Sequence, residues 1–429
     1  MIKVSSISSV INYSQRSADK STVGDRVIKN GAKIGLGSSF CDHLAVTRLT
    51  LTNFRCYKQQ RLEVDGRPVV LTGENGAGKT NLLEALSFLV PGRGLRRAKL
   101  SEIGRRSAER GALVEQWAVA ARIVIGQNNI EIGTGCDITK VPSNNPLEGS
   151  GGRDKRVIKI DGMVLKRQAD LGNYTSAQWL TPQMDRLFLE GSSGRRQFID
   201  QLIYGLDPDH AGPVAAYDHS IRSRNKLLRE GRFDPEWLDS IEESVTRHGV
   251  AIAVRRLEAV GRLQEVCWAR NDKFPGAIIN MVGQIEDWLA AEPALAVEDR
   301  LRAALRDSRQ RDANNGSTSF GPHRSDFEVR HGDTGMVAKV CSTGEQKALL
   351  IGIVLATAKL QTEERGYTPL LLLDEILAHL DLARRVSLFE LIIEMGAQAW
   401  ITGTDNEFFA PLGKTVQHVA IEKGSFAQI

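Results

Sequence analysis

The chain has 429 residues, 41% of them hydrophobic and 25% charged, which predicts a large core and two or three folding units. No apolar run reaches the roughly 20 residues of a membrane-spanning helix and no apolar segment at the start resembles a secretion signal, so we expect a cytoplasmic protein outside the membrane. The net charge of +4 permits a polyanionic partner, and the five scattered cysteines lack the paired spacing of metal or redox ligands.

The first forty residues are rich in Ser, Gly and Lys and show little hydrophobic periodicity. We expect residues 1–40 to be disordered, because they offer little apolar surface to bury. An organelle transit peptide and a wrongly chosen start codon are alternative interpretations of the same stretch.

Alternating apolar and polar residues predict strands in the next part of the chain. The first covers residues 44–54, and two more are joined at Asp65-Gly66. Short strands continue from residue 117 to residue 166, with a hairpin turn at Asp161-Gly162 and a loop rich in Pro, Asn and Gly at 142–154.

From about Asp185 the apolar spacing becomes helical. Asp234 can cap a helix whose first residue is Pro235, and the chain from there to about Arg311 is predicted to be mostly helical. Further strands, with helices between them, are expected at residues 326–331, 336–340, 369–374 and 398–404.

A glycine-rich loop, GENGAGKT, follows the apolar strand at 69–72 and matches G-x-x-x-x-G-K-[ST] in full. Its glycines let backbone N–H groups and a helix N-terminus converge on phosphate oxygens. Lys79 would add a positive charge at the outer phosphates, and Thr80 would place its hydroxyl on a magnesium ion. The predicted nucleotide-binding residues of this segment are Gly73, Glu74, Asn75, Gly76, Ala77, Gly78, Lys79, Thr80 and Asn81.

Four consecutive leucines before Asp374 and Glu375 predict a strand buried on both faces that ends in two carboxylates. Asp374 would hold the magnesium ion through water. Glu375 would orient the water that attacks the γ-phosphate or accept its proton. A helix N-cap is the alternative interpretation of two acids after a strand.

A third motif, STGEQKALL, begins an apolar helix with Ser342 and Gly344. A serine hydroxyl and free N–H groups at a helix N-terminus suit a phosphate. Because the loop at Gly73 already supplies one phosphate site, a second one suggests a second subunit whose nucleotide this segment would close over. Glu345, three residues after Ser342, fits a simple capping box equally well.

The segments TNFRCY, GENGAGKTNLLEAL, GPHRSDF, STGEQKALL and LLLDEILAHLD together closely resemble the RecF family, which stands with the SMC proteins among the ATP-binding-cassette ATPases. The resemblance runs from about Leu44 to the C-terminus. It implies an α/β fold with a mixed-sheet ATPase lobe I in residues 41–184 and 312–429 and a helical lobe II in 185–311, without a long coiled coil.

The same resemblance implies ATP and Mg²⁺ as cofactors and an ATP-dependent homodimer that clamps DNA at gaps or stalled forks. Slow hydrolysis would release the DNA. RecO and RecR are the implied protein partners, and recombinational repair, replication restart and SOS induction are the implied roles.

Carried onto this chain, the family pattern makes Lys79 the main phosphate ligand, with a catalytic role that it shares with Glu375. Thr80 and Asp374 would hold magnesium. Gln183 is expected to join the two lobes and to sense magnesium or water.

Ser342 and Gly344 would contact the partner's nucleotide, and Asp381 would lie at the dimer interface near the partner's site. Thr402 or Thr404 stands where transporter ATPases have a switch histidine, so sensing of the γ-phosphate by histidine is not expected.

Basic residues that could neutralise DNA phosphates without reading bases follow the phosphate-loop helix and recur in lobe II. They are Arg93, Arg96, Arg97, Lys99, Arg105, Arg106, Arg195, Arg196, Arg222, Arg224 and Lys226. For each one, a solvated surface charge is the alternative. Aromatic residues between them are sparse, which favours duplex or junction DNA over a single-strand stacking platform. His323 and Arg324 of GPHRSD are as consistent with a structural turn as with a site.

Two other functions remain open at this stage. A transporter or SMC-like ATPase shares the nucleotide motifs, but sustained heptads are absent and GPHRSD is rarely found in transporters. A binding module that holds ATP and scarcely hydrolyses it is the second alternative, and Glu375 argues against it.

Overall fold

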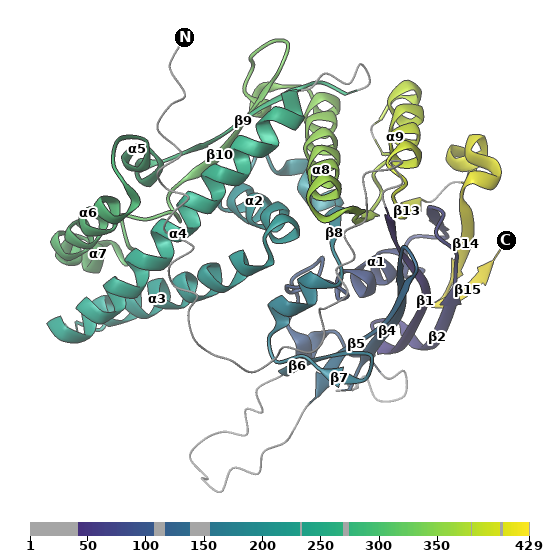
Figure 1. Ribbon diagram of the computed structural model, residues 1–429, viewed down its shortest axis with the longest axis horizontal. Helices are drawn as coiled ribbons and strands as arrows, with labels where there is room; N and C mark the ends of the chain where they lie inside the picture. Colours follow the sequence, from purple (N-terminus) through teal and green to yellow (C-terminus); the bar gives the residue numbers. More distant parts are fainter. Residues whose placement is uncertain are drawn as a thin grey trace, which may run out of the picture.

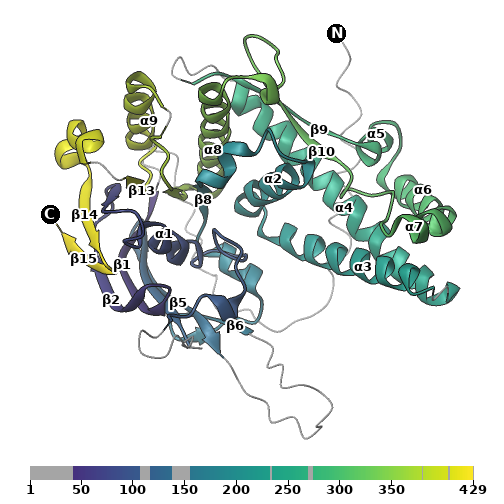
Figure 2. The ribbon, with the colours of Figure 1, turned by 180° about the vertical axis from the view of Figure 1, so that it is seen from behind.

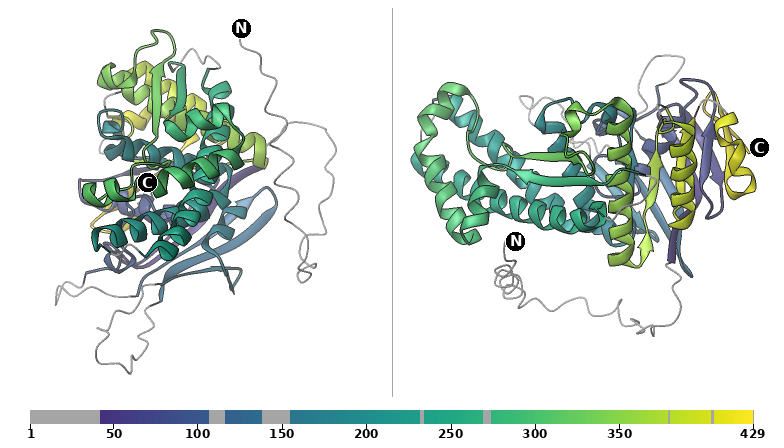
Figure 3. Two further views of the ribbon diagram at one scale, coloured as in Figure 1. Left: turned by 90° about the vertical axis from the view of Figure 1, so that its left-hand side faces the viewer. Right: turned by 90° about the horizontal axis from the view of Figure 1, so that it is seen from above.

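The computed structural model describes residues 42–106, 116–137, 155–231, 234–268, 274–378, 380–403 and 406–428. The predictions for residues 1–40 and for the loop at 142–154 lie outside these ranges. The described chain forms a lobe of sheets and a lobe of helices at opposite ends of the molecule (Figure 1, Figure 3).

A six-stranded sheet occupies the centre of the sheet lobe. Its strands are, in spatial order, β15 (Ser425–Gln428), β14 (Gln417–Glu422), β3 (Val69–Thr72), β13 (Ala399–Gly403), β12 (Leu370–Leu373) and β8 (Ala177–Leu180). All neighbours from β14 to β8 pair in parallel, whereas β15 is antiparallel to β14. The carboxyl ends of five strands therefore meet at one edge of the sheet.

Side chains of β12 are buried on both sides of the sheet, which confirms the prediction for the leucine run. Leu370 and Leu372 pack into a core shared with α1 (Lys79–Ser87) and the second sheet. Leu371 and Leu373 pack on the other side, against α2 (Ser192–Leu206), α8 (Thr343–Arg365) and α9 (Leu382–Glu394). Helices and strands on both faces leave the carboxyl edge as the place where polar groups gather.

The second sheet is mainly antiparallel and lies beyond α1. Its members are β11 (Tyr367–Thr368), β1 (Asp42–Phe54), β4 (Ala118–Ile125), β5 (Asn128–Asp137), β6 (Lys155–Ile160) and β7 (Met163–Val164), with β2 (Tyr57–Glu63) paired to β1. The hairpin at Asp161-Gly162 is confirmed: both residues have positive φ, as a two-residue turn requires. The strands flanking Asp65-Gly66 are present but belong to different sheets.

The helical lobe contains α3 (Ala211–Arg229), α4 (Pro235–Trp268), α5 (Gln284–Ala291), α6 (Ala294–Asp307) and α7 (Arg309–Asn315). Helices α3 and α4 lie along each other (Figure 2). The predicted start of α4 is confirmed, because Asp234 Oδ1 accepts hydrogen bonds from the N–H groups of Glu236 (3.1 Å) and Trp237 (3.2 Å). Within the described ranges α4 is the longest helix, at 34 residues, and no helix has the length and apolar character needed to span a bilayer.

The local predictions miss one strand and wrongly place another. Strand β9 (Ala277–Val282) lies inside the stretch predicted to be mostly helical, and it pairs with β10 (Asp326–His331). Residues 336–340 form no ladder strand; a 3-10 turn, η5 (Ala338–Val340), leads instead into α8. The pairing of β9 with β10 is long-range, and local periodicity does not reveal it.

Candidate nucleotide site

The glycine-rich loop begins where β3 ends and turns into α1 at the carboxyl edge of the parallel sheet. Gly73 has φ +147°, and a Cβ there would lie 2.3 Å from the carbonyl oxygen of Ile421. Gly78 has φ +123°, and a Cβ would lie 2.8 Å from the hydroxyl of Tyr57. Neither position has room for a side chain, so the backbone of the loop is held close to its neighbours.

The N-terminus of α1 has no side-chain cap. Helix α8, in contrast, begins with a full capping box, and α9 is capped by the carboxylate of Asp381, which accepts a hydrogen bond from the N–H of Arg384 at 2.8 Å. An uncapped helix start leaves backbone N–H groups available to an anion. This property and the glycine conformations fit the triphosphate of a nucleotide.

Lys79 lies at the first position of α1 and is nearly buried. Its Nζ donates hydrogen bonds to the carbonyl oxygens of Gly73 (2.5 Å) and Glu74 (3.0 Å). Burial lowers the pKa of Lys79, and the nearby carboxylates of Glu375 and Asp374 oppose that shift. The ammonium group is thus held against the inner side of the loop, where bound phosphate would meet it.

Three side chains, from α1, from the end of β12 and from β13, converge beside the loop. Asp374 Oδ1 accepts hydrogen bonds from the hydroxyls of Thr80 (3.0 Å) and Thr402 (2.8 Å). Burial raises the pKa of Asp374, while these two hydrogen bonds act in the opposite direction. Thr402 is fully buried on β13, the strand between β3 and β12, so the strand order explains how its hydroxyl reaches Asp374.

Glu375 follows Asp374 with an exposed side chain and a left-handed backbone, φ +49°. Its N–H donates a hydrogen bond to the hydroxyl oxygen of Thr402 at 2.8 Å. Left-handed backbone is costly for a residue with a side chain. The Thr402 hydroxyl therefore orients the Asp374 carboxylate and also stabilises the backbone that presents Glu375.

The oxygen donors fit a magnesium ion bound together with a nucleotide. The hydroxyl of Thr80 and the carboxylate of Asp374 lie 3.0 Å apart, so both are available at one place, where Asp374 would hold a hydrated magnesium ion through water. Among the described residues there is no group of three or more His, Cys, Asp or Glu side chains that would hold a metal ion. One carboxylate and one hydroxyl suit a hydrated Mg²⁺ whose remaining ligands come from phosphates.

The other loop residues frame this centre. Glu74, Asn75 and Gly76 are exposed, and the N–H of Ala77 bonds to the carbonyl oxygen of Glu74 at 3.1 Å. The side chain of Asn81 accepts a hydrogen bond from Arg96 (2.8 Å) and donates one to the sulfur of Cys56 (3.2 Å).

The serine-bearing motif forms its own capping box. Ser342 is exposed, its Oγ donates a hydrogen bond to Glu345 Oε2 at 2.7 Å, and the same carboxylate oxygen accepts the N–H of Ser342 at 2.8 Å. The Arg384 side chain joins this motif to α9, since it reaches the carbonyl oxygen of Gly344 (3.3 Å) and lies 3.6 Å from the Asp381 carboxylate. Within the described chain, neither Ser342 nor Gly344 forms a hydrogen bond with the phosphate loop.

Gln183 lies in η3 (Pro182–Arg186), just beyond the carboxyl end of β8, and lines a cleft of about 880 Å³ between the lobes. The nearby Asp185 forms an ion pair with Lys347 of α8 at 3.2 Å. The structure thus places Gln183 at the junction of the lobes and does not bring it into a hydrogen bond with Thr80 or Asp374.

Several basic residues singled out for DNA have internal partners instead. Arg224 is fully buried and bonds to Glu242 and Asp312, which makes it a core residue and corrects its selection. Arg195 pairs with Asp326 at 2.7 Å, and Arg196 bonds to the carbonyl oxygen of Ser325 at 2.7 Å.

The GPHRSD segment organises lobe II. His323 accepts a hydrogen bond from the Tyr217 hydroxyl (2.6 Å) at Nδ1 and donates one from Nε2 to the carbonyl oxygen of Thr318 (3.0 Å). Arg324 donates to the same oxygen at 2.7 Å and 2.9 Å. These contacts support a structural role for the segment.

Comparisons with known proteins agree with this architecture. The family model of the RecF/RecN/SMC N-terminal domain matches residues 45–426. The DNA replication and repair protein RecF of Agrobacterium fabrum is 45% identical over 383 residues, which cover 89% of this chain and 98% of that protein. The protein of the same name from Rhizobium meliloti is 44% identical over 381 residues, covering 88% and 97% respectively.

A solved structure of the recombination mediator protein RecF with ATP, from the RecFOR pathway, shares the fold. Its TM-score is 0.70 at 24% identity, and the match covers 90% of this chain and 100% of that chain. A second one, with ATPrS, has a TM-score of 0.74 at 24% identity and covers 90% and 99%. With an ATP-binding-cassette architecture and relatives of this similarity over nearly their whole length, the chain belongs to the RecF family.

Proposed function

We propose that the chain is an ATP-dependent DNA-binding protein of replication and repair that uses nucleotide as a switch. The observation that carries the proposal is the uncapped start of α1 beside the Thr80, Asp374 and Thr402 cluster. A positive helix terminus, a buried lysine and a carboxylate with two hydroxyl donors form a site for a triphosphate with its metal ion.

In this site Lys79 and the N–H groups of the loop would bind the phosphates, and Thr80 and Asp374 would hold the magnesium ion. The metal ion supplies positive charge that stabilises the phosphoryl group during transfer. Glu375 would position the attacking water and accept its proton. Thr402 would hold Asp374 and Glu375 in position relative to each other, because its hydroxyl contacts both residues.

The active form would be a homodimer. Ser342 is exposed, Gly344 and Asp381 lie on either side of Arg384, and none of the three bonds to the phosphate loop of the same described chain. Their placement suits contact with a nucleotide held by a second copy. ATP binding would close two copies around DNA at a gap or stalled fork, and slow hydrolysis would release it.

The biological setting is proposed from the relatives, which are named DNA replication and repair proteins. One solved structure of similar fold belongs to the RecFOR pathway. We therefore extend to this chain a role with RecO and RecR in recombinational repair, replication restart and SOS induction.

Sedimentation with and without ATP tests the shared site. Wild type is expected to dimerise with ATP, and Lys79→Met and Ser342→Arg to remain monomeric. Ser240→Arg, an exposed position in α4, is the matched control and should dimerise. ATP-dependent dimerisation of Ser342→Arg equal to wild type would overturn the shared site.

Turnover measured with Glu375→Gln separates an ATPase from a module that only binds ATP. We expect this variant to bind ATP with unchanged affinity and to lose about a hundredfold or more in turnover. Equal turnover by wild type and Glu375→Gln would favour the binding module.

A further inference from the structure

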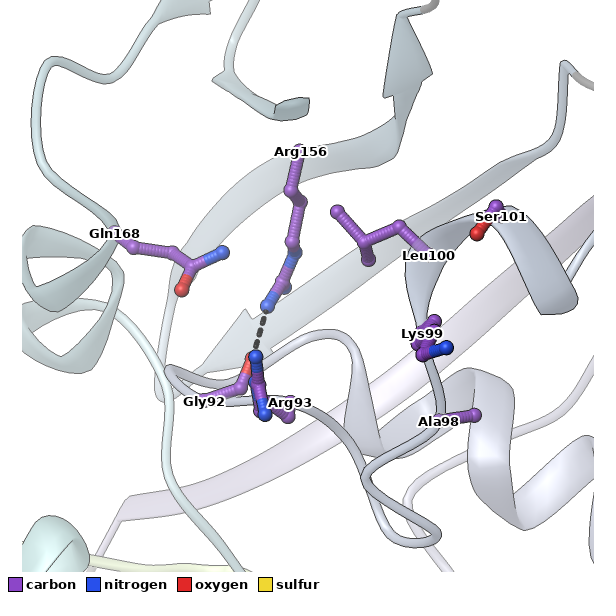
Figure 4. A pocket seen from close by; sticks show the side chains of 8 residues that line it. All are labelled: Gly92, Arg93, Ala98, Lys99, Leu100, Ser101, Arg156 and Gln168. Carbon is purple, nitrogen blue, oxygen red and sulfur yellow. Dashed lines mark hydrogen bonds between the residues drawn. The ribbon is translucent and has the colours of Figure 1, made fainter. Parts of the chain in front are cut away.

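A pocket of about 500 Å³ opens on the far side of α1 from the phosphate loop, beyond the C-terminus of the helix. Its lining comes from the segment after α1, from β6 and from the start of η2 (Gln168–Asn173). The lining residues are Gly92, Arg93, Ala98, Lys99, Leu100, Ser101, Arg156 and Gln168 (Figure 4). We call it the Arg156 pocket.

The charge of the Arg156 pocket is one-sided. Arg93, Lys99 and Arg156 surround it, and the described lining contains no acidic residue. Glu102 approaches Lys99 to 3.9 Å, but both side chains are mostly exposed, so the pair is weak. The hydroxyl of Ser101 and the amide of Gln168 add hydrogen-bond donors that an anion accepts.

Arg156 is part of the pocket wall, and several contacts hold its side chain in place. Its guanidinium donates a hydrogen bond to the carbonyl oxygen of Gly92 at 2.7 Å (Figure 4). It also donates hydrogen bonds to Thr134 Oγ1 (2.8 Å) and to the carbonyl oxygen of Phe88, and it stacks on the Phe88 ring. None of its partners is a carboxylate. Burial lowers the pKa of Arg156 to about 9, which leaves the group cationic at neutral pH. Its charge is therefore not neutralised by the described chain.

The basic residues that follow α1 differ in whether their side chains have partners within the protein. Arg96 bonds to Asn81 (2.8 Å) and pairs with Glu84, and Arg97 bonds to Gln197 (2.7 Å), so these two are engaged within the protein. Arg93 is exposed and has no ion-pair or hydrogen-bond partner among the described residues. Of the basic residues that line the pocket, Arg93 has no such partner and Lys99 has only the weak pair with Glu102, so both can meet an external anion.

We propose that the Arg156 pocket binds a backbone phosphate of nucleic acid, an inference that rests on the DNA binding proposed above. Three cations, two neutral donors and a surface opening suit one phosphate of a chain that continues past the pocket. A contact to a backbone phosphate would be independent of base sequence.

The position of the pocket also connects DNA to the nucleotide. Phe88 is the C-cap of α1, and Arg156 binds the carbonyl oxygens of Phe88, Val90 and Gly92 directly after that helix. A phosphate bound here would contact the arginine that holds these carbonyl oxygens, at the opposite end of the helix whose start would hold the ATP phosphates. DNA binding is then coupled to the ATP site through one nine-residue helix.

The test is the double variant Arg93→Gln/Lys99→Gln, with Lys359→Gln/Lys414→Gln as the control that removes two exposed charges elsewhere on the ATPase lobe. A labelled duplex is titrated in the presence of ATP over a range of salt. The pocket variant is expected to lose about tenfold in affinity and to lower the salt slope of log K by about 1. ATP affinity without DNA stays at the wild-type value, and so does duplex binding by the control.

Equal loss in both double variants, or wild-type affinity in the pocket variant, overturns the inference and leaves the proposed function intact. Wild-type protein that binds no duplex overturns both. Inorganic phosphate is a separate arm: if it raises the melting temperature of wild type but not of the pocket variant, while both bind duplex equally, the pocket takes free phosphate and the nucleic-acid assignment is wrong.

Discussion

Lys347 of α8 and Asp185 of η3 form an ion pair, with Nζ 3.2 Å from Oδ2. Lys347 is 3% exposed and Asp185 is 26% exposed, so the pair lies at the edge of the core. The pair joins α8, whose N-cap is Ser342, to η3, which carries Gln183 at the junction of the lobes.

Asp185→Asn is expected to lower the free energy of unfolding by about 1 to 3 kcal/mol, because the nearly buried ammonium loses its charge partner. Lys347→Met, which removes the charge and keeps the length, should cost less. Urea unfolding of both single variants and the double variant measures the coupling, and Lys359→Met, exposed on the same helix, is the control. Additive effects in the double variant would contradict the pairing.

Thr402→Val keeps the shape of the side chain and removes the hydroxyl that contacts both Asp374 and Glu375. We expect ATP turnover to fall by about tenfold to a hundredfold, as small misplacements of catalytic groups do. Thr402→Ser should restore it. Thr357→Val removes another buried hydroxyl, in α8, and should leave turnover unchanged. Wild-type turnover in Thr402→Val would exclude a positioning role.

Gly73→Ala is expected to destabilise the fold by about 3 kcal/mol, since the new methyl group meets a backbone oxygen at a positive φ. Gly76 also has positive φ, +83°, but faces open space. Gly76→Ala should therefore cost only about 1 kcal/mol. Thermal and urea unfolding compare the two, and equal costs would show that the close approach to Ile421 does not constrain the loop.

Burial lowers the pKa of His323 to about 4, from an ordinary value of 6.5. The unfolded chain then takes up a proton as pH falls below about 6.5 while the folded chain does not, so stability is complete above that pH and declines toward pH 4. The loss from this residue between pH 7 and 5.5 is about 1 kcal/mol. His323→Gln, which keeps an acceptor and a donor, should remove this part of the pH dependence in urea unfolding. An unchanged pH profile would mean that His323 titrates normally.

Local signals in the sequence were sufficient for much of the architecture. The leucine run before Asp374 predicts a strand buried on both faces, and Asp234-Pro235 predicts the start of α4; the structure confirms both. The phosphate-loop pattern carries its own strand and helix, and β3 and α1 are found there. The roles assigned to the nucleotide-site residues remain predictions.

What the sequence did not reveal depends on contacts between distant residues. The sequence pointed to Thr402 only as a residue in the place of the switch histidine. Its contacts with Asp374 and Glu375 depend on β13 lying between β3 and β12. Arg156 and Lys347 carry no motif at all, and only the packed structure shows their surroundings. Strand β9 was missed for the same reason, since its partner β10 begins 44 residues after β9 ends, at Asp326.

The position of β3 between β13 and β14 has a consequence for biosynthesis. The ribosome produces residues 69–72 early, yet both neighbours of this strand lie beyond residue 398. The central sheet therefore closes only after residues 399–422 have been made, and a chain truncated before them leaves a hydrophobic strand edge uncovered. Incomplete products of this gene should be recognised by chaperones and proteases and should not accumulate as partially active ATPases.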